Sequence, residues 1–368
     1  MDINLIRDTA GHFAFEGCFA DAEELLSGHI NRTYHLFFEL PSGGKREYIL
    51  QKINTYVFKK PEELMSNIKR VTEYLQGICR DEGIDASRRV LHLIDTNDGE
   101  CMYRDNEGGC WRAYDYVTDA TAYNILESGA QFEESGRAFG RFQRMLSAFP
   151  AAELYETIPD FHNTRKRFEN FEAAVAADKS GRAGGVGQEI RFFRDRSKQM
   201  TRIVELIEAG ELPLRVTHND TKINNVMLDN ETGEGICVID LDTVMPGSAL
   251  YDYGDSIRTG ASTAAEDEKD LSKIDVDMDM FRAFTKGFIS GTDGSLTKLE
   301  LELLPLGALV MIYENGMRFL TDYIDGDVYF RVAYTEHNLV RARSQMKLLE
   351  CMEAKYDTLC AITRELVG

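Results

Sequence analysis

The spacing of apolar and polar residues is that of β-strands near the start of the chain and that of helices farther on. Residues 30–40 (INRTYHLFFEL) and 47–54 (EYILQKIN) alternate as strands do, and the turn sequence Pro-Ser-Gly-Gly at 41–44 joins them. This pattern predicts a β-hairpin. The Gly-Gly-Lys within it lacks the G-x-x-x-x-G-K-[ST] frame of a phosphate-binding loop, so we interpret it as a turn.

A helix is predicted directly after the hairpin. Pro61 suits the first helical position, and Leu64, Ile68 and Val71 then repeat at helical spacing up to about Gly77. Two more strands are predicted, at 89–94 and 110–117. Further helices are predicted at 132–149, 163–177, 189–207, 299–323 and 337–366.

The order of these elements, strands first and helices later, divides the chain into two lobes. A chain of 368 residues also exceeds the size of most single cores. We therefore predict an α+β protein with a small β-rich N-terminal lobe (1–113), a hinge (114–118) and a large helical C-terminal lobe (119–368).

The charge balance argues against a nucleic-acid partner. The net charge is −20, whereas proteins that bind a phosphate backbone need a positive surface. Seven scattered cysteines without a C-x-x-C pair predict neither a disulfide framework nor a zinc site. The first residues (MDINLIRDTAGHF) do not resemble a secretory signal, and no run of about 18 apolar residues occurs. We expect a cytoplasmic protein with no membrane span, and no protein partner is implied.

The residues with the clearest chemistry lie at 216–244 (VTHNDTKINNVMLDNETGEGICVIDLDTV). An apolar run delivers Asp220 into a polar loop, Asn225 follows five positions later, and a second apolar run ends at Asp240. Phosphoryl transfer needs a carboxylate to accept or orient the proton of the attacking hydroxyl, and oxygen ligands for magnesium. We therefore predict Asp220 as the catalytic base, Asn225 and Asp240 as Mg²⁺ ligands, and ATP as the phosphate donor. The alternative is that these residues only cap turns.

The frame H-x-D-x-x-x-x-N, followed by a hydrophobic strand and Ile-Asp, resembles the aminoglycoside phosphotransferase and choline kinase superfamily, which has a bilobal protein-kinase-like fold. Five segments resemble the N-acetylhexosamine 1-kinases within it: GHINRTY, YILQKIN, THNDTKINNVMLD, IDLDTVMPGSALYDYGDSIR and MRFLTDYIDGDVYF. The resemblance runs over nearly the whole chain. It implies phosphorylation of the anomeric hydroxyl of N-acetylglucosamine or N-acetylgalactosamine, and scaffolding roles for His218, Asp252 and Asp255.

The phosphate-covering loop of such a fold is expected at 27–31 (SGHIN), between the first two strands. The resemblance places His29 of this loop at the sugar. A kinase also needs a cation near the α- and β-phosphates, normally a lysine on the third strand. Strand alternation puts either Gln51 or Lys52 at that position, and we treat both as candidate nucleotide-binding residues.

The end of the small lobe is expected to meet the adenine ring. Residues 113–117 (AYDYV) form the connection, and their main chain would contact the adenine edge. Tyr116 and Val117 are therefore predicted as nucleotide-binding residues. The helix partner of the phosphate-binding cation stays open between Glu63 and Asn67, which lie one turn apart.

The acceptor side is predicted near the end of the long helix at 299–323. Glu314, Arg318 and Asp322 are spaced i, i+4, i+8 and share one helix face. Such spacing most often belongs to a solvated stripe of ion pairs. The resemblance instead implies that Arg318 and Tyr329 contact the hexosamine, and we include Asp322 among the candidate substrate-binding residues.

The combined hypothesis is an ATP- and Mg²⁺-dependent N-acetylhexosamine 1-kinase. One alternative is a kinase of another small hydroxyl compound, such as a different sugar or an aminoglycoside. A second is a pseudokinase that binds nucleotide without turnover, which the joint presence of Asp220, Asn225 and Asp240 argues against.

Overall fold

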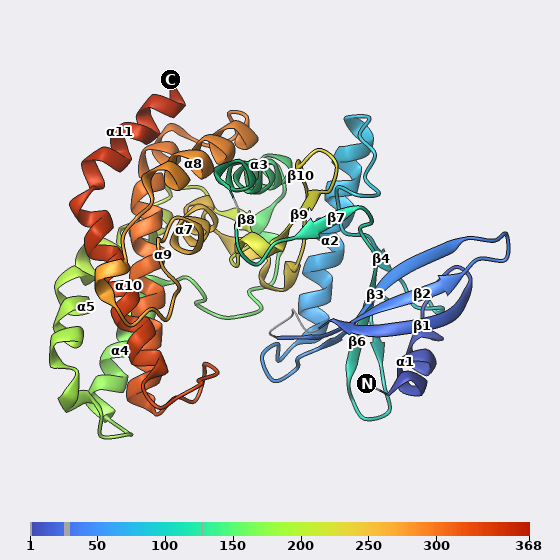
Figure 1. Cartoon of the computed structure of the whole chain (residues 1–368), viewed down its shortest axis with the longest axis horizontal. Helices are drawn as coiled ribbons and strands as arrows, with labels where there is room; N and C mark the ends of the chain where they lie inside the picture. The colour runs from blue at the N-terminus through green and yellow to red at the C-terminus, as the bar shows by residue number, and fades with distance from the viewer. Residues whose placement is uncertain (1, 26–29, 127) are drawn as a thin grey trace.

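The computed structural model describes residues 2–25, 30–126 and 128–368, and these form two lobes (Figure 1). The elements of the small lobe are α1 (Ile3–Ala10), β1 (Cys18–Leu25), β2 (Arg32–Glu39), β3 (Lys45–Ile53), α2 (Pro61–Asp81), β4 (Leu93–Ile94), β5 (Tyr103–Arg104) and β6 (Cys110–Asp115). The strands form an antiparallel sheet in the order β1-β2-β3-β6-β4, with β5 paired to β6. The predicted hairpin is confirmed, because β2 and β3 are direct partners.

The two faces of this sheet pack on different parts of the molecule. Ile53 of β3 belongs to a hydrophobic cluster with α2 and the large lobe. Leu50 belongs to a separate cluster with α1 on the opposite face. Because side chains alternate along a strand, Gln51 shares the face of Ile53, and Lys52 shares the face of Leu50.

Helix α2 belongs to the small lobe in sequence but is fastened to the large lobe. It stands between the sheet and the large lobe in Figure 1. The buried Asn67 donates from Nδ2 to the carbonyl oxygens of Tyr155 (2.8 Å) and Val244 (3.0 Å), and its Oδ1 accepts from the N–H of Tyr155 (2.9 Å). Asn67 therefore serves as a fixed link between the two lobes.

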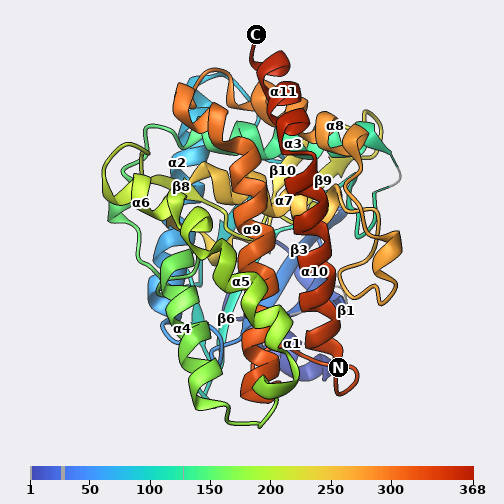
Figure 2. The same cartoon turned by 90° about the vertical axis from the view of Figure 1, so that its left-hand side faces the viewer.

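The large lobe is mainly helical. Its helices are α3 (Gly129–Met145), α4 (Thr164–Ala177), α5 (Gly187–Met200), α6 (Arg202–Glu208), α7 (Ala249–Gly260), α8 (Met278–Thr292), α9 (Lys298–Asp325), α10 (His337–Ala354) and α11 (Tyr356–Val367). Its strands are β7 (Ala120–Ala122), β8 (Arg215–Thr217), β9 (Val226–Asp229), β10 (Gly235–Val238) and β11 (Met245–Gly247). Helix α9 runs through the middle of this lobe with α10 beside it (Figure 2), and most of its residues are buried.

The predicted helices are present, but two of them are interrupted. The helix expected at 189–207 is divided into α5 and α6 at Thr201, whose hydroxyl donates to the carbonyl oxygen of Lys198 (3.1 Å). Such local side-chain bonds compete with the helical ladder. The helix expected at 337–366 is divided into α10 and α11 at Lys355. Helices α7 and α8 were not predicted.

Helices α3 and α8 pack with their backbones in near contact. Four glycines line this contact: Gly136 and Gly140 on α3, and Gly287 and Gly291 on α8. A Cβ atom on Gly287 would collide with the carbonyl oxygen of Glu133. Only glycine permits this approach, because any side chain would have to push the two backbones apart.

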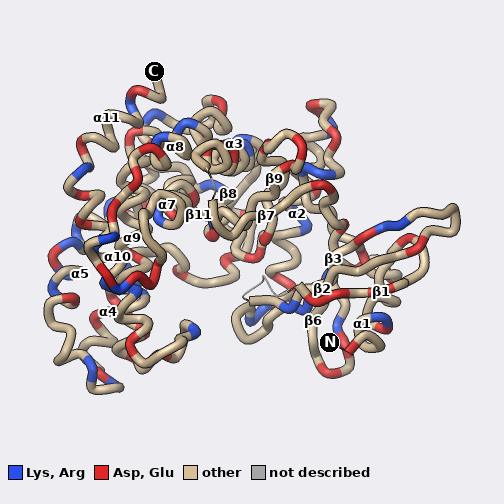
Figure 3. The backbone as a smooth tube through the Cα atoms, in the orientation of Figure 1, with Lys and Arg blue, Asp and Glu red and all other residues tan. Residues whose placement is uncertain are grey.

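Acidic and basic residues are interspersed along both lobes (Figure 3). The net charge of −20 is thus an excess spread over the chain rather than one acidic segment. Among the described residues, no helix combines the length and apolar character that crossing a bilayer requires.

Candidate active site

Short antiparallel strands in the large lobe carry the predicted catalytic residues. Asp220 lies in the loop after β8, Asn225 ends a 3₁₀ turn before β9, and Asp240 follows β10. The N–H of Ile239 donates to the carbonyl oxygen of Asn225 (2.9 Å), which places Asn225 and Asp240 at the same end of the β9–β10 pair. Asn225 Nδ2 donates to the carbonyl oxygen of Asp220 (2.7 Å). The three residues therefore lie together.

Asp252 fixes the loop that carries Asp220. Its buried carboxylate, on α7, accepts the backbone N–H groups of His218 (2.9 Å) and Asn219 (2.8 Å). Gln143 of α3 donates its side-chain amide to the same carboxylate (2.7 Å). A charged acceptor that takes several N–H groups holds them in one geometry, so the predicted scaffolding role of Asp252 is confirmed.

The imidazole of His218 is also part of the scaffold. It is fully buried, and its Nε2 lies 2.9 Å from the carbonyl oxygen of Ile239. Its Nδ1 accepts the backbone N–H of Asp220 (3.3 Å). These two partners suit the neutral tautomer with the proton on Nε2. His218 thereby joins the loop of Asp220 to the end of β10.

Two residues of the site have a left-handed backbone conformation. The φ angles are 64° at Asn219 and 59° at Asp240. Asn and Asp tolerate this region better than other side chains do. Asn219 is held by donation from its side-chain amide to the carbonyl oxygens of Thr217 (3.3 Å) and Thr243 (2.8 Å). Backbone strain of this kind gathers at functional sites.

The charges around Asp240 fit a divalent cation. The side chain reaches solvent, yet within the described residues its carboxylate has no hydrogen-bond partner. Crowding by protein atoms and repulsion from Asp242 and Asp220 raise the pKa of Asp240 to about 6. A cation beside Asp240 and the amide oxygen of Asn225 would relieve this repulsion. The described residues contain no cluster of three acidic, histidine or cysteine side chains suited to a metal, so water and phosphates would complete the shell, as Mg²⁺ prefers.

The sheet separates the two candidates for the phosphate-binding cation. Lys52 donates to the carboxylate of Asp105 (3.3 Å) and lies 5.1 Å from the ring centre of Trp111, on the face toward α1. That face points away from the large lobe, so the geometry does not support the predicted phosphate contact of Lys52. Gln51 is on the face toward the large lobe, where its Oε1 accepts from Nε of Arg112 (3.0 Å).

The predicted adenine contact remains compatible with the connection after β6. The ring of Tyr116 stacks on His35 with centres 4.1 Å apart, so its side chain already has a partner. The side chain of Val117 is buried, and no partner for its backbone N–H occurs in the described part of the chain. This N–H is available to a nucleotide base. His29, the predicted loop residue, lies outside the described residues.

Arg318 of α9 lies among aromatic rings. Its guanidinium carbon is 5.4 Å from the ring centre of Phe161, 5.5 Å from that of Phe330 and 6.0 Å from that of Tyr329. Throughout 2–25, 30–126 and 128–368, Arg318 has no hydrogen bond or salt bridge. A partly buried guanidinium without a hydrogen bond or salt bridge is available to a ligand that offers oxygen acceptors.

Glu314, one turn before Arg318, connects α9 to the catalytic loop. It is fully buried, lies 2.7 Å from Nδ1 of His162 and accepts the hydroxyl of Thr164 (3.0 Å). Although burial raises it, attraction to His162 keeps the pKa of Glu314 below its usual value. His162 Nε2 is 3.2 Å from the carbonyl oxygen of Asn219. The helix face is therefore not a solvated ion-pair stripe.

Asp322 has a different role from the one predicted. Its buried carboxylate accepts the backbone N–H groups of Val328 (2.9 Å), Tyr329 (2.8 Å) and Phe330 (3.0 Å). Both oxygens are used in folding the turn after α9, so the geometry does not support a direct sugar contact. Asp322 instead positions the two aromatic rings beside the arginine.

Comparison with known proteins agrees with this geometry. A model described as the phosphotransferase enzyme family matches residues 21–272, more than half of the chain. The chain belongs to this family. Among solved structures, a spectinomycin phosphotransferase in complex with ADP and spectinomycin is 14% identical, covers 100% of this chain and 98% of its own, and has a TM-score of 0.55.

Two further solved structures are similar to this chain. An amicoumacin kinase in complex with AMP-PNP, Ca²⁺ and Ami is 14% identical over 94% of this chain and 93% of its own, with a TM-score of 0.57. A choline kinase from Cryptosporidium parvum Iowa II is 13% identical over 99% of both chains, with a TM-score of 0.59. At these identities the likeness concerns the fold, and the predicted bilobal kinase-like fold is confirmed.

Two basic residues at the candidate active site of this chain were missed by the sequence analysis. Lys222 Nζ lies 2.7 Å from a carboxylate oxygen of Asp220. Burial lowers the pKa of Lys222, but attraction to Asp220 outweighs this and raises it. Its place two positions after the predicted base was a usable signal. The other residue is Arg112, which no local motif marks.

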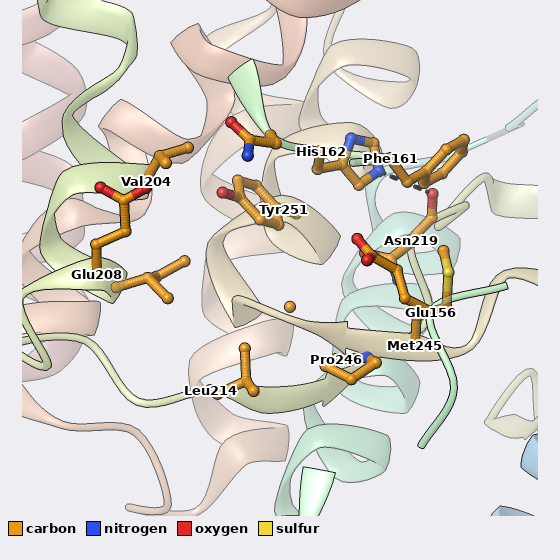
Figure 4. Close-up of a pocket in the computed structure, with 13 residues that line it drawn as sticks. Glu156, Phe161, His162, Val204, Glu208, Leu214, Asn219, Met245, Pro246 and Tyr251 are labelled. Carbon is orange, nitrogen blue, oxygen red and sulfur yellow. Dashed lines mark hydrogen bonds between the residues drawn. The ribbon is translucent and has the colours of Figure 1, made fainter. Parts of the chain in front are cut away.

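A cavity of about 210 Å³ lies against the catalytic loop (Figure 4). Its wall includes Asn219 and His162 but not Asp220 or Arg318, so it is distinct from the predicted acceptor position. Phe161 contributes to both, because its ring lines the cavity and also faces the Arg318 guanidinium.

Proposed function

We propose that this phosphotransferase is a kinase that transfers the γ-phosphate of ATP to the anomeric hydroxyl of an N-acetylhexosamine. The sequence resemblance described above supports the sugar class. The solved relatives that hold ADP, or AMP-PNP with Ca²⁺, support a nucleotide donor with a divalent cation. The proposed division is a nucleotide-binding lobe at 1–113, a hinge at 114–118 and a catalytic and sugar-binding lobe at 119–368.

Each catalytic group has one proposed task. Asp220 accepts or orients the proton of the attacking hydroxyl, and Lys222 lies where a cation can approach the transferred phosphoryl group. Asn225 and Asp240 would hold Mg²⁺. When bound, Mg²⁺ neutralises charge on the β- and γ-phosphate oxygens. The N–H of Val117 would bind the adenine edge.

The observation that carries the sugar assignment is the unpaired Arg318 among three aromatic rings. A guanidinium offers a planar set of donors to hydroxyl and carbonyl oxygens, and aromatic faces pack against the apolar side of a sugar ring. The same positive charge repels a cationic acceptor. The surroundings of Arg318 therefore favour a neutral sugar over an aminoglycoside or choline. Glu314 and His162 would fix the position of α9 relative to the loop of Asp220.

We expect N-acetylglucosamine or N-acetylgalactosamine to be used clearly better than glucose and galactose. Arg318→Lys should lower kcat/KM for the sugar by about 10- to 100-fold, because an ammonium cannot reproduce the guanidinium's paired hydrogen bonds. The KM for ATP should change little. The measurement is kcat/KM for these four sugars and an aminoglycoside, with the phosphate position of the product determined by phosphorus NMR.

Arg282→Lys is the matched control, since Arg282 is an arginine on α8 paired with Glu365 at the surface. It should behave as the parent does. An unchanged profile in Arg318→Lys would remove Arg318 from the acceptor site. Equal use of glucose and N-acetylglucosamine, or preference for the aminoglycoside, would overturn the hexosamine assignment. Absence of ATP consumption with every acceptor would favour the pseudokinase alternative.

A further inference from the structure

The phosphates of a nucleotide between the lobes need a positive partner from the small lobe. In protein kinases this partner is a lysine on the third strand. Here the face of β3 toward the large lobe carries Gln51, and Lys52 is bound to Asp105 on the other face. The lysine of β3 therefore does not stand at the usual place of the phosphate-binding cation, although the phosphates still require a cation.

Arg112 occupies the neighbouring position on β6. It is the direct cross-strand partner of Gln51, and its Nε donates to Gln51 Oε1 (3.0 Å). Cys110 and Tyr114, two positions away on either side, belong to the cluster with α2 and the large lobe. Arg112 thus points to the same face as Gln51. Gln51, which stands at the usual lysine position, orients the guanidinium of Arg112 from the adjacent strand β6.

The guanidinium of Arg112 contacts the large lobe at Asp242, two residues after Asp240. Arg112 is 1% exposed and Asp242 is 3% exposed. Arg112 Nη1 and Asp242 Oδ1 form a buried ion pair that joins the two lobes. The other carboxylate oxygen of Asp242 accepts from Asn31 Nδ2 (2.6 Å).

We propose that Arg112 is the small-lobe cation that binds the nucleotide phosphates, with Gln51 as its positioning residue and Asp242 as its partner in the absence of nucleotide. This assignment rests on the proposed function only for the nucleotide donor and is independent of the acceptor. A phosphate oxygen would replace the carboxylate of Asp242 as the partner of this guanidinium. Charge-assisted bonds of this kind are stronger than neutral ones, and a guanidinium can make two at once.

The competing explanation is a static ion pair that only holds the lobes together. In that case, loss of Arg112 would weaken adenosine and ATP binding equally, through the arrangement of the lobes. If Arg112 binds phosphate, the loss must grow with the number of phosphates on the ligand. A nucleotide series therefore separates the two explanations.

The experiment measures equilibrium binding of adenosine, AMP, ADP and ATP by calorimetry, with and without Mg²⁺, to the full chain. Arg112→Met alone would leave Asp242 buried without a counter-charge and thus risk unfolding. The comparison is therefore between the parent and the double variant Asp242→Asn with Arg112→Met, in which neither charge is left buried without its partner. We expect the double variant to bind ADP and ATP about 10- to 100-fold more weakly, with adenosine affinity changed by less than about threefold.

The control neutralises another buried pair, Arg215 with Glu300, which lies between β8 and α9. Arg215→Met with Glu300→Gln should leave the ratio of ADP to adenosine affinity unchanged. An unchanged ratio in the Arg112 comparison, with or without Mg²⁺, would overturn the assignment while the kinase proposal stands. Failure of the parent chain to bind any nucleotide would overturn the ATP donor and this assignment together.

Discussion

Replacing Asp220 with asparagine is expected to lower kcat by about 10²- to 10⁴-fold, the usual contribution of a positioned proton acceptor. The substitution keeps the size of the side chain but removes the charge that accepts the proton and pairs with Lys222 at 2.7 Å. The loop itself should persist, because Asp252 holds it through the backbone N–H groups of His218 and Asn219. The measurement is ADP release at saturating sugar and ATP.

Asp357→Asn provides the control for this change, since Asp357 is an exposed acidic residue on α11. Asp357→Asn should have the kcat of the parent. Asp220→Asn and Asp357→Asn should both have the melting temperature of the parent. Turnover near the parent rate in Asp220→Asn would show that another group handles the proton.

Asp240→Ala is expected to abolish turnover at ordinary Mg²⁺ concentrations. Lewis-acid stabilisation of phosphate charge contributes several kcal/mol, which corresponds to a loss of roughly 10³-fold or more. Asn225→Ala should be milder, because Asp240 remains, and raised Mg²⁺ or Mn²⁺ should restore part of its activity. Chelation of divalent ions should silence the parent enzyme. The measurement is the rate as a function of metal concentration in the three proteins.

Asp240→Ala should not lower the stability of the metal-free protein. The pKa of Asp240 is raised to about 6 in the folded protein, above its ordinary value. Its charged form is therefore unfavourable in the metal-free fold at neutral pH, and this cost shrinks as pH falls from that pKa toward the ordinary pKa of an aspartate. Metal-free Asp240→Ala should accordingly melt at or above the temperature of the parent at pH 7.5. A large drop in melting temperature would contradict this electrostatic cost, and activity that survives full chelation would contradict the proposed metal role.

The proximity of the three proposed catalytic residues was predictable because they are local in sequence. Asp220 and Asn225 lie in one short loop, and Asp240 follows the apolar strand β10, which pairs with the preceding strand β9. The turn residues and the apolar strands indicate this arrangement, so it can be predicted without knowing how the two lobes pack. The hairpin of β2 and β3 was predictable for the same reason, since its alternation and its turn are adjacent.

The nucleotide side and the acceptor side were harder to predict, because they depend on packing between distant elements. Alternation shows that Gln51 and Lys52 lie on opposite faces, but only the positions of α1 and α2 decide which face meets the large lobe. Asp322 shares a helix face with Arg318 as predicted, yet the chain returns after α9 and uses its carboxylate for the turn. Arg112 lies in an apolar strand, and its importance follows from a partner far away at Asp242.

The glycine contact between α3 and α8 restricts how the large lobe can rearrange around a nucleotide. Sliding of packed helices past one another needs interfaces that tolerate small shifts, but these two backbones are too close to slide. Gly235 of β10 approaches α3 in the same way, at the carbonyl oxygen of Glu134. These contacts hold α3, α8 and β10 together as one rigid unit. Shear between α3 and α8 is therefore not expected to contribute to any rearrangement of the protein on nucleotide binding.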